Sequence, residues 1–383
     1  MPALLAGPFL LVTLANFCFF LNFASFFLLP LHIKALGGSE AMVGAVMGTN
    51  GLASLLVLPL IGSAVDRVGR RPFLVAGAIG MSAASFSFVW VDSVGPWMFI
   101  LRLCQGVSFA AAFTASTTMA AELAPRTQRA QALGLFGLST IVTHAIAPAI
   151  GEEIVQRGGF HTLFIIAASC SAVSAALATR LPAIRTTHAT STPAPWRVDT
   201  LQWVLVGTVA LSGMGFGTVM TFIPTFVRGE GFGRVGFFYG AYTTTAILTR
   251  LIGAGLSDSL GRRAVILPTL LVLATSILAL AFVHSIPALV ATGLLFGAAQ
   301  GVNYPTLHAF IVDLTADEHL GRVQALFNGA FNLGVTGSAF LFGSVAEHAG
   351  HRPTFMLAAA MPAVAWMLLY LFGASTREPA INH

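Results

Sequence analysis

The residues of this sequence with the greatest chemical potential are polar and ionisable side chains that lie inside long apolar runs. They are Arg102, Gln105, His144, Gln300, Asn303, Tyr304 and His308. Burying such groups in hydrocarbon is costly, so they are expected to face a cavity or a polar partner. Their chemistry is solute binding and proton transfer. The sequence contains neither a covalent nucleophile constellation nor a Walker motif, so ATP hydrolysis is not the expected energy source.

Arg102 and Gln105 are three residues apart, which places them on one face of a helix. On a cavity-lining face, Arg102 would bind an anionic substrate group or tune the pKa of a nearby proton carrier. The alternative is a structural arginine whose head reaches the outer interface. His144 has a side chain that titrates near neutral pH, and a packed, neutral histidine is the alternative role there.

Amide side chains extend this set of candidates. Gln300, Asn303, Tyr304 and His308 recur at three and four residues, and form one polar stripe that we expect to face a cavity. Asn328 and Asn332 are four residues apart in the next run. Asn16 lies in the first run, and the spacing of six places Asn22 on another face. We therefore expect the pathway to be lined by Asn16, Asn328 and Asn332 together with the stripe.

The fourteen acidic residues all lie in loops or near predicted helix ends. A carboxylate buried deep in a span, which would serve as a proton carrier, is therefore missing from the sequence. If transport is coupled to protons, a relay of histidines is the remaining route, and facilitated diffusion is the alternative.

The composition predicts that membrane-spanning segments position these groups. The chain is 56% hydrophobic and 9% charged, whereas soluble domains are about 25% charged. A polytopic membrane protein is therefore expected, and nucleic-acid binding is not. Twelve apolar runs are long enough to cross a bilayer, at about 8–31, 42–64, 72–91, 96–120, 130–151, 160–180, 201–227, 236–256, 264–283, 287–312, 322–346 and 353–373.

The densest cluster of charge is a loop predicted at a membrane face, and it occurs twice. The first copy runs from Gly62 to Arg71, and the second from Gly255 to Arg263, with Asp66 and Asp258 separated by 192 positions (258 minus 66). Gln105-Gly106 and Gln300-Gly301 repeat at a similar offset. The sequence therefore predicts an internal duplication, with halves 1–180 and 201–383 and a Thr- and Pro-rich linker at 181–200.

The pattern G-x-x-x-D-R-x-G-R-R of the first copy closely resembles the loop between the second and third helices of the major facilitator superfamily. This resemblance implies an all-α polytopic membrane protein with twelve transmembrane helices in two pseudo-symmetric halves, which transports solutes by alternating access. It also implies that the charged turns and the helix ends beside them form gates. The residues are Asp66, Arg67, Gly69, Arg70, Arg71, Glu122, Arg129, Asp258, Gly261, Arg262, Arg263, Asp313 and Arg322. Arg129 and Arg322 are the expected partners of the two aspartates.

Two further motifs bear on the type of transport. Arg102-Leu-Cys-Gln105-Gly106 resembles the R-x-x-Q-G motif of drug–proton antiporters in this superfamily. The sequence around Pro148 and Gly151 resembles the exporters' antiporter motif only in part, because Thr143, Ala147 and Glu152 replace glycines. The first motif favours proton-coupled efflux.

The basic residues predict an orientation. Twelve of the nineteen fall in segments that would be cytoplasmic if both termini are inside, and five fall in outer segments. The first run has no basic region before it and is expected to be retained as a helix. We expect a monomer in a bacterial inner membrane, with the lipid bilayer and a small solute as its partners.

The sequence therefore favours a secondary transporter that exports a small amphipathic or weakly anionic organic solute, driven by the proton gradient and without a cofactor. The alternative is an uptake symporter or facilitator for a sugar, an organic acid, a metal or a metal chelate. A non-transporting sensor would be expected to carry a long soluble domain. No histidine and methionine pairs suited to a metal path lie within a span, so no metal site is predicted.

Overall fold

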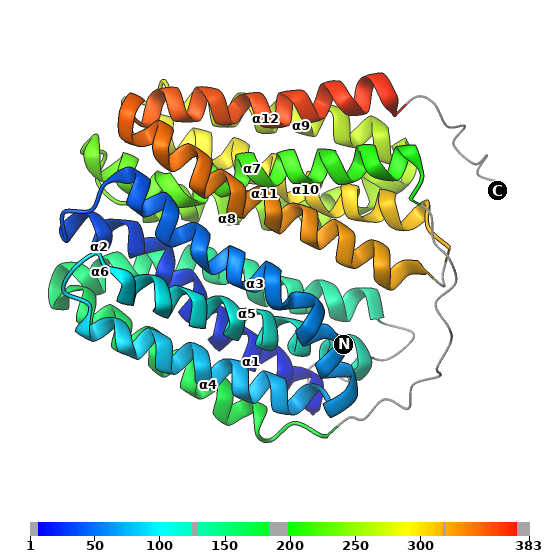
Figure 1. The fold of residues 1–383 in the computed structure, drawn as a ribbon. Helices are drawn as coiled ribbons and strands as arrows, with labels where there is room; N and C mark the ends of the chain where they lie inside the picture. The colour runs from blue at the N-terminus through cyan, green and yellow to red at the C-terminus, as the bar shows by residue number, and fades with distance from the viewer. Residues whose placement is uncertain (1–6, 125–128, 184–197, 317–318, 374–383) are drawn as a thin grey trace.

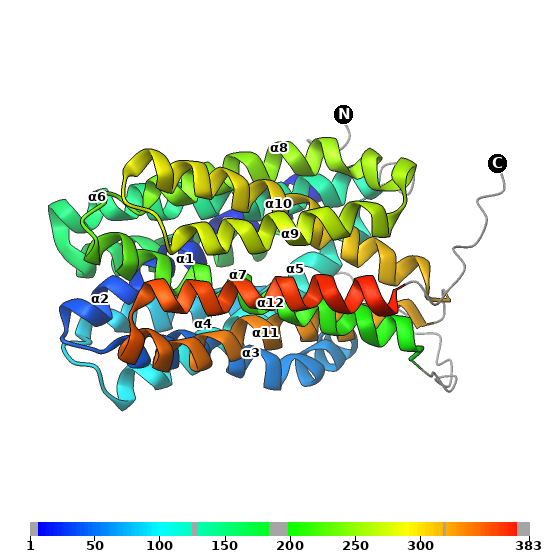
Figure 2. The ribbon, with the colours of Figure 1, turned by 90° about the horizontal axis from the view of Figure 1, so that it is seen from above.

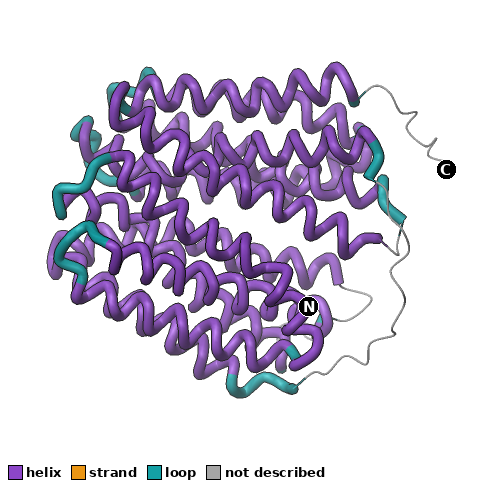
Figure 3. Tube along the Cα trace, viewed as in Figure 1, coloured by secondary structure: helices purple, strands orange, loops and turns teal. Residues whose placement is uncertain are grey.

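The computed structural model describes residues 7–124, 129–183, 198–316 and 319–373, although the side chains of residues 129–130, 252–254 and 321 are not described. Every regular element in these ranges is a helix. Figures 1 and 3 show long, roughly parallel helices, with the N-terminal half lying below the C-terminal half. Most of the predicted linker, residues 184–197, lies outside the described residues.

The N-terminal half begins with a broken span, and its elements are α1 (Pro8–Ser25), η1 (Phe26–Leu28), α2 (Leu29–Ala35), α3 (Glu40–Val68), α4 (Arg70–Ser87), η2 (Phe88–Trp90), α5 (Pro96–Leu123) and α6 (Arg129–Ala178). The first predicted span is interrupted by η1 because Pro30 follows it. Proline has no N–H to donate, and its ring clashes with the carbonyl four residues earlier. The element α6 contains two predicted spans, 130–151 and 160–180, which are two helices joined at Gly159, a residue with a non-helical φ of 74°.

The C-terminal half contains α7 (Thr200–Gly229), α8 (Gly236–Leu260), α9 (Arg262–Leu280), α10 (Ile286–Asp313), α11 (Leu320–Ala349) and α12 (His351–Phe372). Its packing repeats that of the first half. In the N-terminal half α1 packs on α6, and α5 packs on α3 and α4. In the C-terminal half α7 packs on α11 and α12, and α10 packs on α8 and α9. The sequence duplication is therefore a duplication of helix packing.

The predicted membrane spans correspond to these helices. Among the residues searched, ten helices are long and apolar enough to cross a membrane, and one of them, Gln131–Ala178, contains two predicted spans. The predicted span that remains corresponds to α8. Figures 1 and 2 both place the turn after α2 and the turn before α5 at one end of the bundle. We name this the outer end, after the orientation that the basic residues predict, and the opposite end the inner end.

The charged turns at the inner end are shorter than the loops that the sequence predicted. Helix α3 ends at Val68 and α4 begins at Arg70, so that Gly69 alone separates them, and Gly261 separates α8 from α9 in the same way. Both glycines have positive φ, 110° and 89°. Only glycine adopts this backbone conformation without strain, so the turn can be a single residue.

The apolar core shows how the two halves meet. One cluster of buried residues extends across both halves and includes Phe27, Val43 and Phe164 together with Phe226 and Tyr239. Two further clusters each belong to one half. The cluster of the N-terminal half lies on inner portions of its helices and includes Leu74 and Ala178. That of the C-terminal half includes Ile266 and Leu369. The halves therefore share a core toward the outer end and have separate cores toward the inner end.

Candidate transport pathway and gates

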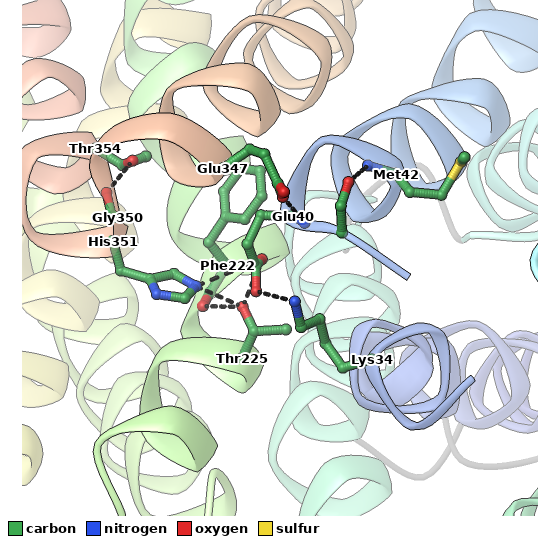
Figure 4. Close-up of polar contacts among 10 residues, drawn as sticks. Lys34, Glu40, Met42, Phe222, Thr225, Glu347, Gly350, His351 and Thr354 are labelled. Atoms are coloured by element: carbon green, nitrogen blue, oxygen red, sulfur yellow. Dashed lines mark hydrogen bonds and ion pairs between the residues drawn. The ribbon is translucent and has the colours of Figure 1, made fainter. Parts of the chain in front are cut away.

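A buried carboxylate at the outer end joins the two halves (Figure 4). Glu40, the first residue of α3, is only 6% exposed. Its carboxylate lies 3.4 Å from Nζ of Lys34 and 3.4 Å from Nε2 of His351, and accepts a hydrogen bond of 3.1 Å from Thr225. The Glu40 backbone N–H donates to the carboxylate of Glu347 at 2.6 Å. Helices α2 and α3 are thereby connected to α7, α11 and α12.

A second carboxylate connects the halves on another side of the outer end. Glu152 of α6 is 8% exposed, and accepts hydrogen bonds from the backbone N–H groups of Val235 and Gly236, at 2.9 and 2.8 Å. These N–H groups lie at the start of α8, where unpaired donors and the helix dipole favour a negative charge. Beside it, Glu153 pairs with Arg234 at 3.0 Å.

An aromatic layer fills the space between these contacts. Phe27 of η1 stacks on Tyr239 of α8, with ring centroids 5.5 Å apart. His144 of α6 lies 5.0 Å from Phe27 and 6.4 Å from Tyr242, so it is in contact with rings from both halves. Its Nδ1 atom has no hydrogen-bond partner among the described residues. His144 thus lies where the halves meet, as expected of a group on the pathway, although its predicted transport role is untested.

An ion pair outside the spans fixes the outer ends of the C-terminal half. Arg352 donates to Glu230 at 2.9 Å, and to the carbonyl of Ala281. This hydrogen bond lowers the pKa of the Glu230 carboxyl below its usual range. The pair connects α7, α9 and α12 within one half.

The charged clusters at the inner end have the same arrangement in both halves. In the first half Arg70 contacts Asp66 at 3.1 Å and Glu122 at 3.0 Å. In the second half Arg262 contacts Asp258, and also Asp313 at 2.8 Å. The predicted acidic groups are therefore brought together, but around Arg70 in the first turn and the corresponding Arg262 in the second.

Each inner cluster is confined to its own half in this conformation. Among the described side chains, Arg70 pairs with Asp66 and Arg262 with Asp258. The pairing that the sequence predicted, with Arg129 and Arg322, stays a prediction. The Arg129 side chain lies outside the described residues, and Arg67 is exposed. No ion pair between described side chains joins the halves at the inner end. A gating role for these residues remains a prediction. It concerns a different conformation, in which the inner end is closed.

The last arginines of the two turns bind helix ends. Arg71 donates to the carbonyl of Thr179, just after the end of α6, and Arg263 donates to the carbonyl of Tyr370 in α12 at 2.8 Å. The last carbonyls of a helix lack intrahelical partners, and a nearby cation also offsets the negative end of the dipole. These contacts hold the ends of α4 and α9 against their neighbours.

Arg102 lies inside the N-terminal half, with its hydrogen-bonding groups occupied. It is 5% exposed, and donates to Gln105 at 2.8 Å and to the carbonyls of Val46 and Met47 at 3.3 and 3.5 Å. The spacing correctly predicts that Arg102 and Gln105 meet. Gln105 continues the network to Ser85 at 3.1 Å. The network connects α5 to α3 and α4, so these contacts position the three helices. Substrate binding by Arg102 remains a prediction.

The other predicted amides fall into two environments. Asn16 is 1% exposed and donates to Ser139 and Thr140 of α6, each at 2.9 Å. In the C-terminal half Tyr304 donates to Asn328 at 2.9 Å, and Asn332 donates to the Asn328 carbonyl. Asn16 therefore links helices within its half, whereas the Tyr304 pair is only half-buried.

The first two residues of the polar stripe on α10 are buried. Gln300 and Asn303 are 8% and 1% exposed. Oε1 of Gln300 and both amide atoms of Asn303 have no hydrogen-bond partner in the described part of the chain. His308 packs on Phe327 with ring centroids 5.0 Å apart. Unpaired buried amides cost free energy and suit a site that a polar solute or water completes.

Sequence reasoning missed two carboxylates and one arginine. Glu40 and Glu152 appeared to be ordinary helix-end residues, because their partners in the other half cannot be recognised from local sequence. Arg250 lies within a predicted span, but no motif surrounds it. A charged residue within a span is itself a sign of a functional site, and this sign could have identified Arg250 as a candidate.

The comparisons with known proteins agree with this architecture. The chain matches the family model of the Major Facilitator Superfamily over residues 11–240 and 205–382. It belongs to this superfamily of membrane transporters, which confirms the family and the fold that the sequence predicted, and it is not an enzyme.

Individual relatives are distant but cover most of the chain. The uncharacterized MFS-type transporter YhhS of Escherichia coli strain K12 is 25% identical over 368 residues, which are 91% of this chain and 90% of that protein. The multi-drug resistance efflux pump PmrA homolog of Lactococcus lactis is 24% identical over 88% of this chain and 87% of that protein. The crystal structure of a mutant of the nucleoside transporter NupG is similar in fold, with a TM-score of 0.79, 16% identity, and coverage of 96% of this chain and all of that one.

Proposed function

We propose that this protein exports a small amphipathic or weakly anionic organic solute across a bacterial-type inner membrane by alternating access, in exchange for protons. Both termini lie in the cytoplasm in this proposal, and the protein acts as a monomer. The observation that carries the proposal is the asymmetry between the two ends of the bundle. The shared core and the polar contacts between the halves lie at the outer end, whereas the inner portions have separate cores.

This asymmetry is what an inward-facing transporter requires. To open outward, the protein must separate Glu40 from Thr225 and His351, and Glu152 from the start of α8. The polar contacts that join the halves at the outer end connect rigid helices, and the shared apolar core lies beside them, so they would form and break together as the halves move. A solute released outside would have entered from the inner end while the outer end was closed.

The direction of transport is supported by relatives and by sequence. A relative that matches most of the chain is named as an efflux pump, and the R-x-x-Q-G motif resembles that of drug–proton antiporters. Proton coupling is assigned to His144. Its imidazole touches aromatic rings of both halves, so its surroundings must change when the halves move apart.

The test uses cells and everted membrane vesicles. Cells with and without the protein are profiled for small molecules in the cytoplasm and in the medium. A solute enriched in the medium only with the protein is then offered to everted vesicles whose lumen is acidified. We expect wild-type vesicles to accumulate it, and a protonophore to abolish accumulation. His144→Gln vesicles should lose this proton-driven accumulation but retain exchange of labelled for unlabelled solute.

Other results would overturn specific parts of the proposal. A solute that accumulates inside the cells would reverse the direction and favour the uptake alternative. Accumulation that survives the protonophore would exclude coupling to protons. Full proton-driven activity of His144→Gln would remove that residue from the coupling path.

A further inference from the structure

Arg250 lies where the shared core of the two halves ends. Helix α8 begins at Gly236, so Arg250 is about 21 Å along it and about 15 Å from its last residue, Leu260. Tyr242 and Ala246, on the preceding two turns, belong to the core cluster that both halves share. Arg250, one turn further toward the inner end, is only half-buried.

The guanidinium points toward the other half of the protein. A Cβ atom added to Gly137 of α6 would lie 3.9 Å from Nη1 of Arg250. Helix α6 belongs to the N-terminal half and packs against α8 across the boundary. Because Gly137 has no side chain, the space beside the guanidinium stays open on that side.

Polar side chains of α10 lie next to the part of α8 that carries Arg250. Gly301 of α10 packs directly on Ala246 and Thr249 of α8. Tyr304 and His308 follow Gly301 at three and seven residues, one and two turns further along the same face of α10. The two helices therefore bring an arginine, a phenol and an imidazole together at the inner side of the boundary.

Arg250 has no anionic partner in the described structure. Neither an ion pair nor a hydrogen bond connects it to another described residue, whereas Arg70, Arg262 and Arg352 each contact at least one carboxylate. Arg102, the other arginine within a span, donates to Gln105 and two carbonyls. An arginine within a span is costly without a partner, and its planar fork binds a carboxylate through two parallel hydrogen bonds.

We propose that Arg250 binds the carboxylate of the transported solute, with Tyr304 and His308 beside it. This assignment rests on the proposed transport function and narrows its substrate class to amphipathic organic carboxylates. The anion enters from the inner end and replaces water around the guanidinium. No carboxylate of the described chain has to be displaced.

Aromatic rings next to Tyr304 provide a surface for the apolar part of such a solute. The Tyr304 ring lies 4.8 Å from that of Phe331 in α11, and Phe331 lies 5.7 Å from Phe216 in α7. Phe331 and Phe216 are both half-buried. A carboxylate at Arg250 therefore places an attached ring within reach of this aromatic row.

The test measures binding of a defined probe to the full-length protein in lipid nanodiscs. Radiolabelled 2-naphthoate supplies the carboxylate, and 2-naphthamide, of similar shape without charge, serves as competitor. We expect saturable naphthoate binding to the wild type, at least tenfold weaker binding to Arg250→Gln, and intermediate binding to Arg250→Lys. Arg180→Gln, which changes an exposed arginine at the inner end, should bind like the wild type. Gel filtration and thermal melting establish that each variant is folded.

The proposal is overturned if Arg250→Gln binds naphthoate as tightly as the wild type, if naphthamide competes as well as unlabelled naphthoate, or if the wild type shows no saturable binding. The vesicle assay separates this failure from that of the transport proposal. Export of a cellular solute without naphthoate binding would refute the anion site and leave export standing. Naphthoate binding without export in vesicles would refute export and leave the anion site standing.

Discussion

At the scale of single residues, the two arginines within spans have opposite surroundings. Arg102 is buried and donates to Gln105 and two carbonyls, whereas Arg250 has no such partners among the described residues. A satisfied guanidinium connects helices, and an unsatisfied one is available to a ligand. The motif around Arg102 favoured solute binding by the first residue, whereas the lack of partners is the reason we propose solute binding at the second.

Arg102→Met tests the structural role of the first arginine. The substitution keeps an unbranched side chain but removes every donor, so Gln105 and the Val46 and Met47 carbonyls lose their partner. We expect a loss of about 2 kcal/mol of stability, the typical cost of removing a hydrogen bond to a charged group. Thermal melting in detergent measures it, with Arg180→Gln as the control. An unchanged melting temperature combined with lost naphthoate binding would instead support substrate binding by Arg102.

The same contrast shows what sequence can predict at this scale. Helical spacing places Arg102 beside Gln105, because residues three apart lie on the same face of a helix. It does not reveal the burial of Glu40. Besides Lys34, the partners of Glu40 are Thr225, His351 and Glu347, which lie in the other half of the chain. Next to a short turn, an acidic residue at a helix start looks solvent-exposed until the packing of the halves is known.

At the scale of helices, closure of the outer end depends on how closely α3 and α11 approach. A Cβ at Gly44 would clash with the carbonyl oxygen of Ala339 and with the backbone of Gly343. Figures 1 and 2 show α3 and α11 side by side. Small residues permit such close backbone contact between membrane helices. The sequence predicted both helices, but not that these glycines face each other across the boundary between halves.

Gly44→Leu is therefore expected to hold the outer end open. The leucine cannot be accommodated against the Ala339 backbone without moving α11 away. Spin labels at exposed positions Ser93 and His348, in a cysteine-free background, report the distance between the outer ends of the two halves. We expect the population with the longer distance to rise at least tenfold, which corresponds to about 1.4 kcal/mol. Gly62→Leu, at an open position of the same helix, is the matched control.

An unchanged distance distribution in Gly44→Leu would mean that the helices separate elsewhere during opening. A similar change in Gly62→Leu would show that the label pair responds to any bulky residue in α3. The first result would exclude this contact as the closing surface, and the second would remove the support that the label distances give it.

At the scale of the whole molecule, the duplication explains why the fold is predictable while the conformation is not. Twelve apolar runs and two copies of one charged turn define the helices and their pseudo-symmetry. The inner clusters around Arg70 and Arg262 repeat accordingly. The contacts at the outer end do not repeat: Glu40 and Glu152 both belong to the N-terminal half and bind different elements of the other. Conformation depends on these non-repeated contacts, which no local pattern encodes.

These two carboxylates provide a test of rigid-body motion. Glu40 acts where α3 meets α7, α11 and α12, and Glu152 acts where α6 meets α8. If the halves move as rigid bodies, both contacts bias one equilibrium between a closed and an open outer end. Free-energy effects of separate, non-touching sites add, so the factors by which they change a shared equilibrium constant multiply. Glu40→Gln leaves Lys34 and His351 without their carboxylate, and Glu152→Gln weakens the contact with the start of α8.

We therefore expect each single substitution to increase the open population, and the double variant to increase it by the product of the two factors. The Ser93 and His348 spin labels measure all four proteins under one condition, and Glu230→Gln, which breaks an ion pair within the C-terminal half, controls for loss of any outer carboxylate. A double variant no more open than the stronger single variant would show that the two contacts do not report on one common movement. The halves would then not move as rigid bodies, and opening would involve bending of individual helices.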